Sequence, residues 1–303
     1  MKQKFIAFIA ALAVALTVII PTTYASTGDT QNAINEKLGV PIIVYGGNLS
    51  AEEKEKVKTA LRVDKEPEFD EVTVTGNDLV NYIKDSNSSS RMYSSAKITR
   101  QDAGKGLTIS IVTPENITQV TAEMYATAML TAGIEDAIVE VAAPKPVTGH
   151  SALVGIYKAY ELKTGEQLDI ERTDVANDEL GVATTIADAA GVDDAKVAEL
   201  LTEIKKQIAE LKPATREDVE QIVNDQLSKL EISLSEQDRQ LLVDLMDRIS
   251  KLNIDFSKLS DQLTSLSDKF QEQFGALMEN EGFWNSVKNF FKKIGDAISG
   301  LFN

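Results

Sequence analysis

Apolar positions in this chain follow a strand period in some segments and a helix period in others. Short apolar runs at residues 40–45, 109–113 and 137–142 predict buried strands. Between the last two runs, residues 118–132 predict a helix that Thr118 caps and Gly133 ends. Strand, helix and strand in this order are typical of a βαβ unit. We therefore expect an α+β fold in which helices pack on a mixed sheet that contains this unit.

Two regions before this helix predict simpler local structures. Residues 95–99 and 107–113 both have strand character and flank a segment with two glycines, so they predict a β-hairpin. Residues 85–90 have the sequence DSNSSS, which predicts a flexible surface loop without a role of its own.

Helical periods dominate the second half of the chain. Residues 149–162 and 171–190 predict helices, and the second of these has a weak point at Gly181. From Val192 onward strand patterns disappear, and Pro213 breaks the first helix of this part. An all-helical region is therefore expected to follow the mixed sheet, as a hairpin or as a coiled coil.

A heptad stripe lies inside this helical region. Steps of three and four residues connect its apolar side chains, which include Leu242, Leu245, Ile249, Leu252, Phe256, Leu259 and Leu263. Such a stripe is buried either by a neighbouring helix of the same chain or by a second copy. The breaks near Pro213 and Ser233 favour an intramolecular hairpin, and self-association through the stripe is the alternative.

The first 25 residues have the pattern of a signal peptide. Lys2 and Lys4 precede an apolar run at residues 5–20, and small residues allow cleavage after Ala25. The apolar run is shorter than the roughly 20 residues of a membrane span, which favours cleavage over a retained anchor. We expect a secreted protein, either extracellular or associated with the cell envelope.

Charge and cysteine content restrict the function further. The formal net charge is −16, so the chain should repel the phosphates of nucleic acid, and no nucleic-acid partner is expected. The sequence has no cysteine. Thiolate nucleophiles and thiolate metal ligands are therefore excluded, and the fold must rely on its apolar core rather than on disulfides.

Candidate catalytic motifs are weak. Gly149, His150 and Ser151 resemble the start of a Gly-x-Ser-x-Gly nucleophile turn, but Leu153 stands where the final glycine belongs. The only histidine would have to act on the serine beside it. The simpler interpretation is that Thr148 or Ser151 caps the following helix, and we assign no catalytic residue.

Carboxylates are numerous, and a pair of them could hydrolyse glycosides. No spacing in the sequence distinguishes such a pair, so an envelope hydrolase that uses carboxylates is an alternative rather than the main hypothesis. Metal-ligand spacings and phosphate-binding loops are absent from the sequence. We expect neither a metal nor a cofactor.

The C-terminal segment is strongly amphipathic. At 100° per residue, the apolar side chains of residues 283–302 fall within an arc of about 140°. Lysines flank this arc, as in helices that lie on membrane surfaces. The proposed contacts with a membrane surface or an envelope protein are Phe283, Trp284, Val287, Lys288, Phe290, Phe291, Lys293, Ile294, Ile298, Leu301 and Phe302. Packing of this helix against the rest of the chain is the alternative.

Several long motifs resemble one known family. They are TPENIT at residues 113–118, TAGI at residues 131–134, and the run from Val141 to Leu153. Gly39 to Ser50 and TVTG at residues 73–76 fit the same pattern, and the likeness is dense over residues 39–190. The chain resembles the YpuA-like secreted proteins of Gram-positive bacteria, a family of unknown function. The resemblance implies an exported protein with no assigned activity and no catalytic residues to transfer.

Four regions follow from these patterns. Residues 1–25 are expected to form the signal peptide, 26–191 the α+β domain, 192–281 the helical region with the heptad stripe, and 282–303 the amphipathic helix. The expected function is non-enzymatic binding at the bacterial cell envelope, with the last helix as a reversible anchor on a membrane or partner. Self-assembly through the heptad stripe is the structural alternative.

Overall fold

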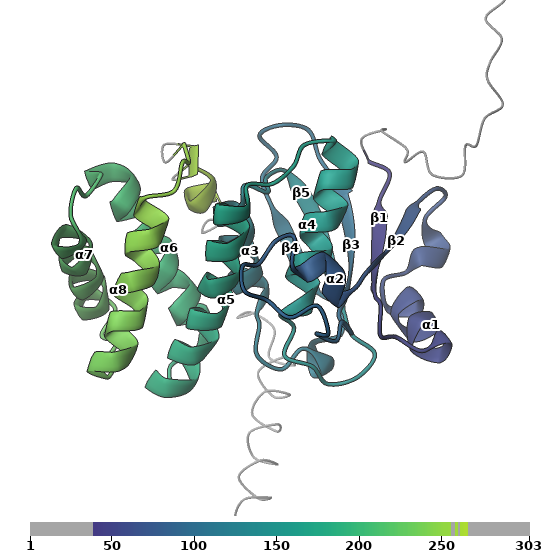
Figure 1. The fold of residues 1–303 in the computed structure, drawn as a ribbon, viewed down its shortest axis with the longest axis horizontal. Coiled ribbons are helices and arrows are strands. Elements are labelled where there is room, and N and C mark those ends of the chain that lie inside the picture. Colours follow the sequence, from purple (N-terminus) through teal and green to yellow (C-terminus); the bar gives the residue numbers. More distant parts are fainter. Residues whose placement is uncertain (1–38, 256–257, 260, 266–303) are drawn as a thin grey trace, which may run out of the picture. The chain divides into compact units, whose positions relative to one another are not determined.

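The computed structural model describes residues 39–255, 258–259 and 261–265 (Figure 1). The expected signal peptide, the eleven contact residues proposed in the C-terminal helix and Phe256 of the heptad stripe lie outside these ranges.

A five-stranded mixed sheet forms the first half of the described chain, as predicted. The order of the strands across the sheet is β2-β1-β3-β5-β4. Strands β1 and β2 are parallel, β4 and β5 are parallel, and β3 runs antiparallel to its neighbours β1 and β5. Their bounds are β1 Ile42–Gly46, β2 Asp70–Val74, β3 Ser95–Arg100, β4 Thr108–Ile111 and β5 Ala137–Ala142.

The βαβ unit is confirmed, and the predicted hairpin is wrong. Strand β4, helix α3 (Ala122–Ala132) and strand β5 follow one another, and the two strands pair in parallel with Ile109 opposite Val139. The hairpin between residues 95–99 and 107–113 does not form, because β5 lies between β3 and β4 and takes the hydrogen bonds of both.

Helix α3 begins later than the sequence predicts. Thr118 does not cap it, because both the backbone N–H and the hydroxyl of Thr118 donate to the carbonyl of Val147. Thr121 is the cap, and its hydroxyl accepts a hydrogen bond from Met124 N. The predicted end of the helix is confirmed, since Gly133 adopts the left-handed conformation at φ +93°.

Helices account for most of the remaining described structure. Two short 3₁₀ turns occur at Val63–Lys65 and Pro114–Asn116. The other helices are α1 Ala51–Ala60, α2 Gly76–Leu79, α4 Ser151–Thr164, α5 Ile170–Ala190, α6 Asp194–Leu211, α7 Arg216–Lys229 and α8 Glu236–Ser250. None of the helices in the described part of the chain combines the length and apolar character that a membrane span requires.

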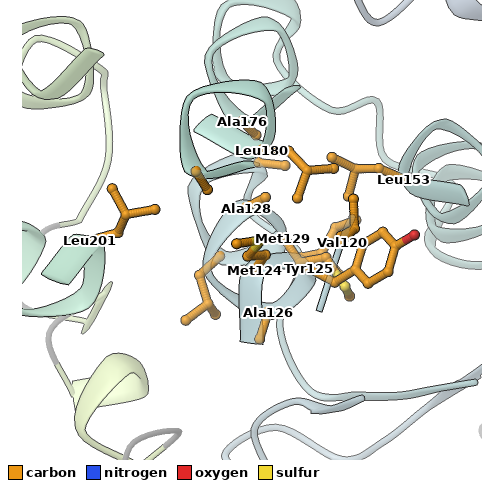
Figure 2. Close-up of a cluster of buried hydrophobic side chains, with 14 of the residues drawn as sticks. Val120, Met124, Tyr125, Ala126, Ala128, Met129, Leu153, Ala176, Leu180 and Leu201 are labelled. Atoms are coloured by element: carbon orange, nitrogen blue, oxygen red, sulfur yellow. The ribbon is translucent and has the colours of Figure 1, made fainter. Parts of the chain in front are cut away.

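Helix α3 is the centre of the main core. Figure 2 shows its side chains Met124, Ala128 and Met129 among apolar side chains from three other helices. These neighbours are Leu153 of α4, Ala176 and Leu180 of α5, and Leu201 of α6. All of them are fully buried, so one apolar cluster joins the helices that cover the sheet to the helices that follow.

The two faces of the sheet are covered differently. Helix α4 packs on β1, β2 and β3, and α3 packs on β4. Gly155 allows the close approach of α4, since a Cβ atom there would lie 3.0 Å from Val44 Cγ1. On the opposite face, α1 covers a smaller apolar cluster that contains Ile43, Tyr45 and Val57.

The heptad stripe is largely buried within the chain. Leu242, Leu245 and Ile249 of α8 have exposed fractions of 3% or less, and α8 packs against α5, α6 and α7. Leu259 and Leu263 are also buried, whereas Leu252 is partly exposed. Helix α8 ends at Ser250. Self-association through the stripe and the four domain boundaries remain predictions.

Candidate functional site

A cleft of about 550 Å³ lies where the chain segment after α2 meets the start of α4 and the middle of α5. We call it the Arg91 cleft. Figure 1 shows α2 beside α4, which it contacts. The lining residues are Leu79, Ile83, Ser86, Asn87, Ser90, Arg91, Met92, Tyr93, Val147, Thr148, Gly149, His150, Ser151 and Asn177.

The charges around this cleft differ from those of the chain as a whole. The sequence has 47 acidic and 31 basic residues other than histidine, yet none of the described lining residues is acidic. Arg91 is exposed and makes no ion pair with the described residues, whereas Arg216, Arg239 and Arg248 all pair with carboxylates. No carboxylate of the described residues therefore competes with an anion from solution for the guanidinium of Arg91.

The wall that carries Arg91 is fixed by the turn that follows β1. Asn48 Oδ1 accepts a hydrogen bond from Met92 N at 2.7 Å, and Asn48 N donates to Met92 O at 3.0 Å. The serine-rich loop before it packs tightly as well, because a Cβ atom at Gly76 would lie only 2.1 Å from Ser88 O. The loop for which the sequence predicted no role thus forms part of the cleft wall.

A second attachment holds the same segment to α5. The hydroxyl of Thr173 donates to Tyr82 O at 2.8 Å, and Lys84 N donates to Asp174 Oδ1 at 2.9 Å. These bonds join residues about 90 positions apart in sequence. They bring the Arg91 wall and Asn177 of α5 to the same cleft.

The start of α4 forms the opposite wall. Tyr125 Oη donates to Gly149 O at 2.6 Å, and Gly149 has a φ of +106°, which a residue with a side chain would rarely adopt. His150 occupies the N-cap position without capping the helix through its side chain. The predicted cap by Thr148 or Ser151 is wrong, and Ser151 Oγ instead accepts a hydrogen bond from Ser94 N at 3.3 Å.

The cleft does not contain the groups of a serine hydrolase. No carboxylate of the described residues forms a hydrogen bond with His150, and Ser151 Oγ accepts from the backbone of Ser94. Burial lowers the pKa of His150 below its usual 6.5, so the imidazole is neutral at pH 7. The arrangement offers one fixed positive charge, a neutral ring and several uncharged hydrogen-bonding groups.

A second concavity of about 440 Å³ adjoins the first, and we call it the α5 groove. It shares His150 and Asn177 with the Arg91 cleft. Its other lining residues are Asp178, Gly181, Val182, Thr185, Leu241, Asp244, Leu245 and Arg248. The charged residues among them are already paired, with Arg248 bonded to Asp178 and Asp244 bonded to Arg216.

Another cluster of charges lies on the sheet face that α1 covers. Lys97 of β3 forms ion pairs with Glu140 and with Glu66, and Arg62 bonds to Glu140 at 2.9 Å. Lys97 Nζ also donates to Leu61 O at 3.0 Å. Every charge in this cluster has an internal partner, so it joins the α1 segment to the sheet. Within the described residues, no group of three or more histidines and carboxylates could hold a metal ion.

Only part of the Arg91 cleft is recognisable in the sequence. Thr148, Gly149, His150 and Ser151 form the motif considered above, and all four line the cleft. Arg91 and Asn177 were not predicted, because no local pattern distinguishes them from other surface residues. The clearest available signal was an arginine directly after a serine-rich loop in an acidic chain.

Comparison with known proteins establishes the family. A family model described as Protein of unknown function (DUF1002) matches residues 45–266. The chain belongs to this family. Uncharacterized protein YpuA of Bacillus subtilis (strain 168) is 34% identical over 270 residues, which cover 88% of this chain and 90% of that protein. The resemblance inferred from the motifs is confirmed, and no solved structure matches. The family is described as of unknown function and the relative as uncharacterized, so neither assigns an activity to this chain.

Proposed function

We propose that this DUF1002 protein is exported and binds a ligand at the bacterial cell envelope through the Arg91 cleft, without catalysing a reaction. The charge of the cleft is the observation that carries the proposal. Arg91 lines it without a described carboxylate partner, and the described lining has no acidic residue. An anionic group can therefore enter this cleft, although the protein as a whole would repel it.

The chemistry of the lining supports binding over hydrolysis. Glycoside hydrolysis generally needs two carboxyl groups on either side of the scissile bond. The described lining of the Arg91 cleft supplies none, and Asp178 and Asp244 of the adjoining groove are ion-paired with Arg248 and Arg216. Acyl transfer by Ser151 would need a base within hydrogen-bond reach. The described structure has no hydrogen bond between His150 and Ser151, whose hydroxyl instead accepts from Ser94.

Export and attachment are the other parts of the proposal. The signal-peptide pattern of residues 1–25 supports export. The amphipathic pattern of residues 283–302 supports a reversible contact with a membrane surface or envelope protein. The acidic body opposes attachment to an anionic surface, but charges more than about 10 Å away are screened at 0.1 M salt. The terminal helix can then act locally.

Sedimentation with cell walls tests the proposal. The protein without residues 1–25 is mixed at about 0.15 M salt, near the ionic strength of the cell, with walls purified from Bacillus subtilis, the source of the relative. Wild type should sediment with the walls, and Arg91→Ala should weaken this binding about tenfold, equivalent to about 1.4 kcal/mol.

Arg100→Ala is the matched control, because Arg100 also lacks an ion pair with the described residues and does not line the cleft. It removes the same charge and should leave binding unchanged. Failure of the wild type to sediment, or equal losses in both variants, would overturn the proposal.

A further inference from the structure

The Arg91 cleft and the α5 groove adjoin each other. His150 and Asn177 line both, so a ligand long enough to pass these two side chains would occupy both concavities. Together they extend from the Arg91 wall, past the start of α4, to the surface between α5 and α8. This shape suits an extended molecule better than a single small anion.

Gly181, which lines the α5 groove, is an unexpected residue for the inside of a helix. It lies inside α5, where glycine disfavours the helix relative to alanine. The fold does not require it, because a Cβ atom at Gly181 would meet nothing within 4 Å. Gly155 of α4 differs, since its Cβ atom would touch Val44. A Cβ atom at Gly181 would instead extend into open space beside the α5 groove, where the bare backbone permits close approach of a ligand.

The distribution of charge indicates what the ligand carries. Arg91 and the neutral His150 provide a single positive charge, which matches a carboxylate better than a doubly charged phosphate. Asn177 supplies amide donors and an acceptor, as a peptide backbone requires, and Asn87 adds amide donors, since its Oδ1 already accepts from Ser89. In the α5 groove Leu241 is 41% exposed, and it offers an apolar surface beside charges that already neutralise each other.

The same lining is poorly suited to a glycan. Sugar sites commonly use exposed aromatic rings, and Tyr93 is the aromatic side chain in the described lining of the cleft. Lys145 Nζ lies 3.9 Å from the centroid of that ring, so one face is already covered.

We propose that the Arg91 cleft and the α5 groove together bind an extended peptide, with the terminal carboxylate on Arg91 and the backbone crossing α5 at Gly181. This inference rests on the proposed envelope-binding function and names the ligand class of the same site. Arg91 and Gly181 have separate roles in it. Arg91 binds the C-terminal carboxylate of the peptide, and the missing side chain at Gly181 leaves space for the peptide backbone.

The probe is a mixture of N-acetylated hexapeptides of randomised sequence, prepared with either a free C-terminal carboxylate or an amide. The protein without residues 1–25 should enrich peptides from the carboxylate pool and not from the amide pool. For an enriched peptide, calorimetry should show about a tenfold loss of affinity with Arg91→Ala and no loss with Arg100→Ala.

Gly181→Ala separates binding from folding. Because alanine favours the helix, this variant should raise the melting temperature by about 2–4 °C, yet weaken peptide binding at least tenfold. Asp188→Ala is the control, since it also raises helix propensity at an exposed position of α5 that does not line the groove. It should leave the peptide affinity within twofold of the wild-type value.

The outcomes distinguish this inference from the proposed function. If walls bind through Arg91 but neither peptide pool is enriched, the peptide inference is wrong and the envelope-binding function stands. If walls do not bind, the proposed function fails. Enrichment of both pools equally, or a Gly181→Ala variant that is stabilised and binds normally, would also overturn the inference.

Discussion

Lys205 Nζ lies 2.7 Å from Glu179 Oε1, and the two side chains are 0% and 1% exposed. This ion pair joins α6 to α5. The remaining donors of the ammonium group bond to Thr127 O at 3.0 Å and to Thr131 Oγ1 at 3.1 Å, both on α3. Glu179 Oε2 accepts from the same threonine hydroxyl at 2.5 Å. Burial lowers the pKa of Lys205, although Glu179 favours its charged form.

Removing one partner of this pair should be costly. Lys205→Met leaves the carboxylate of Glu179 buried without its cation, and we expect a loss of about 3–5 kcal/mol in the free energy of unfolding. The double variant Lys205→Met with Glu179→Leu replaces both charges by apolar groups and should recover most of this loss. Urea unfolding at pH 7 measures both. A double variant no more stable than Lys205→Met would contradict the account.

His150 should make stability depend on pH. Its pKa in the folded protein lies below the ordinary 6.5, so the unfolded chain binds more protons as the pH falls below 6.5. The stability contributed by the neutral ring is therefore complete above pH 6.5 and is lost as the pH falls through the folded pKa. Urea unfolding between pH 7.5 and 5 should show a smaller decline for His150→Gln than for wild type. Parallel curves would mean that burial does not disfavour the charged ring.

Signal-peptide cleavage should give the exported protein a defined N-terminus. The pattern around Ala25 predicts cleavage before Ser26, so protein from the culture medium or the wall fraction should begin there. N-terminal sequencing checks this. Protein that begins at Met1 and stays in the membrane fraction would show that the apolar run is a retained anchor.

The terminal segment should bind lipid. Trp284 is the only tryptophan in the sequence, so its fluorescence should shift to the blue when anionic vesicles are added. Lysines near the surface contribute about 1 kcal/mol each, so the shift should weaken with salt. A chain ending at Asn280 should remain folded and lose vesicle binding. Loss of stability in the truncated chain, with a blue-shifted Trp284 before lipid is added, would instead indicate packing within the protein.

Local sequence patterns predicted where helices and strands occur better than they predicted which strands pair and which residues bond to each other. Gly133 ends α3 as predicted, because a glycine end signal acts within a few residues. The partner of β3 was mispredicted because strand pairing is decided by the packed sheet. Similarly, Thr118 donates its hydrogen bonds to the carbonyl of Val147, so α3 begins after Thr121 rather than at Thr118.

The candidate site was less predictable, because it consists of residues far apart in sequence. Arg91 and Asn177 line one cleft because the segment that carries Arg91 is bonded to α5 at Tyr82 and Lys84. The sequence gives a weak indication of the buried Lys205–Glu179 ion pair. Lys205 stands four residues after Leu201, on the apolar side of α6. Its partner Glu179 could not be identified, because no sequence pattern indicates which carboxylate will be buried beside it.

Nuclear magnetic resonance of the His150 ring tests the central claim most directly. His150 is the only histidine, so the ring signals of an untagged chain need no assignment. Soluble fragments of Bacillus subtilis cell wall should shift these signals in a saturable way, and Arg91→Ala should remove the shift while Arg100→Ala keeps it. Binding of the fragments with unchanged His150 signals, or with equal shifts in both variants, would place the ligand elsewhere and contradict the account.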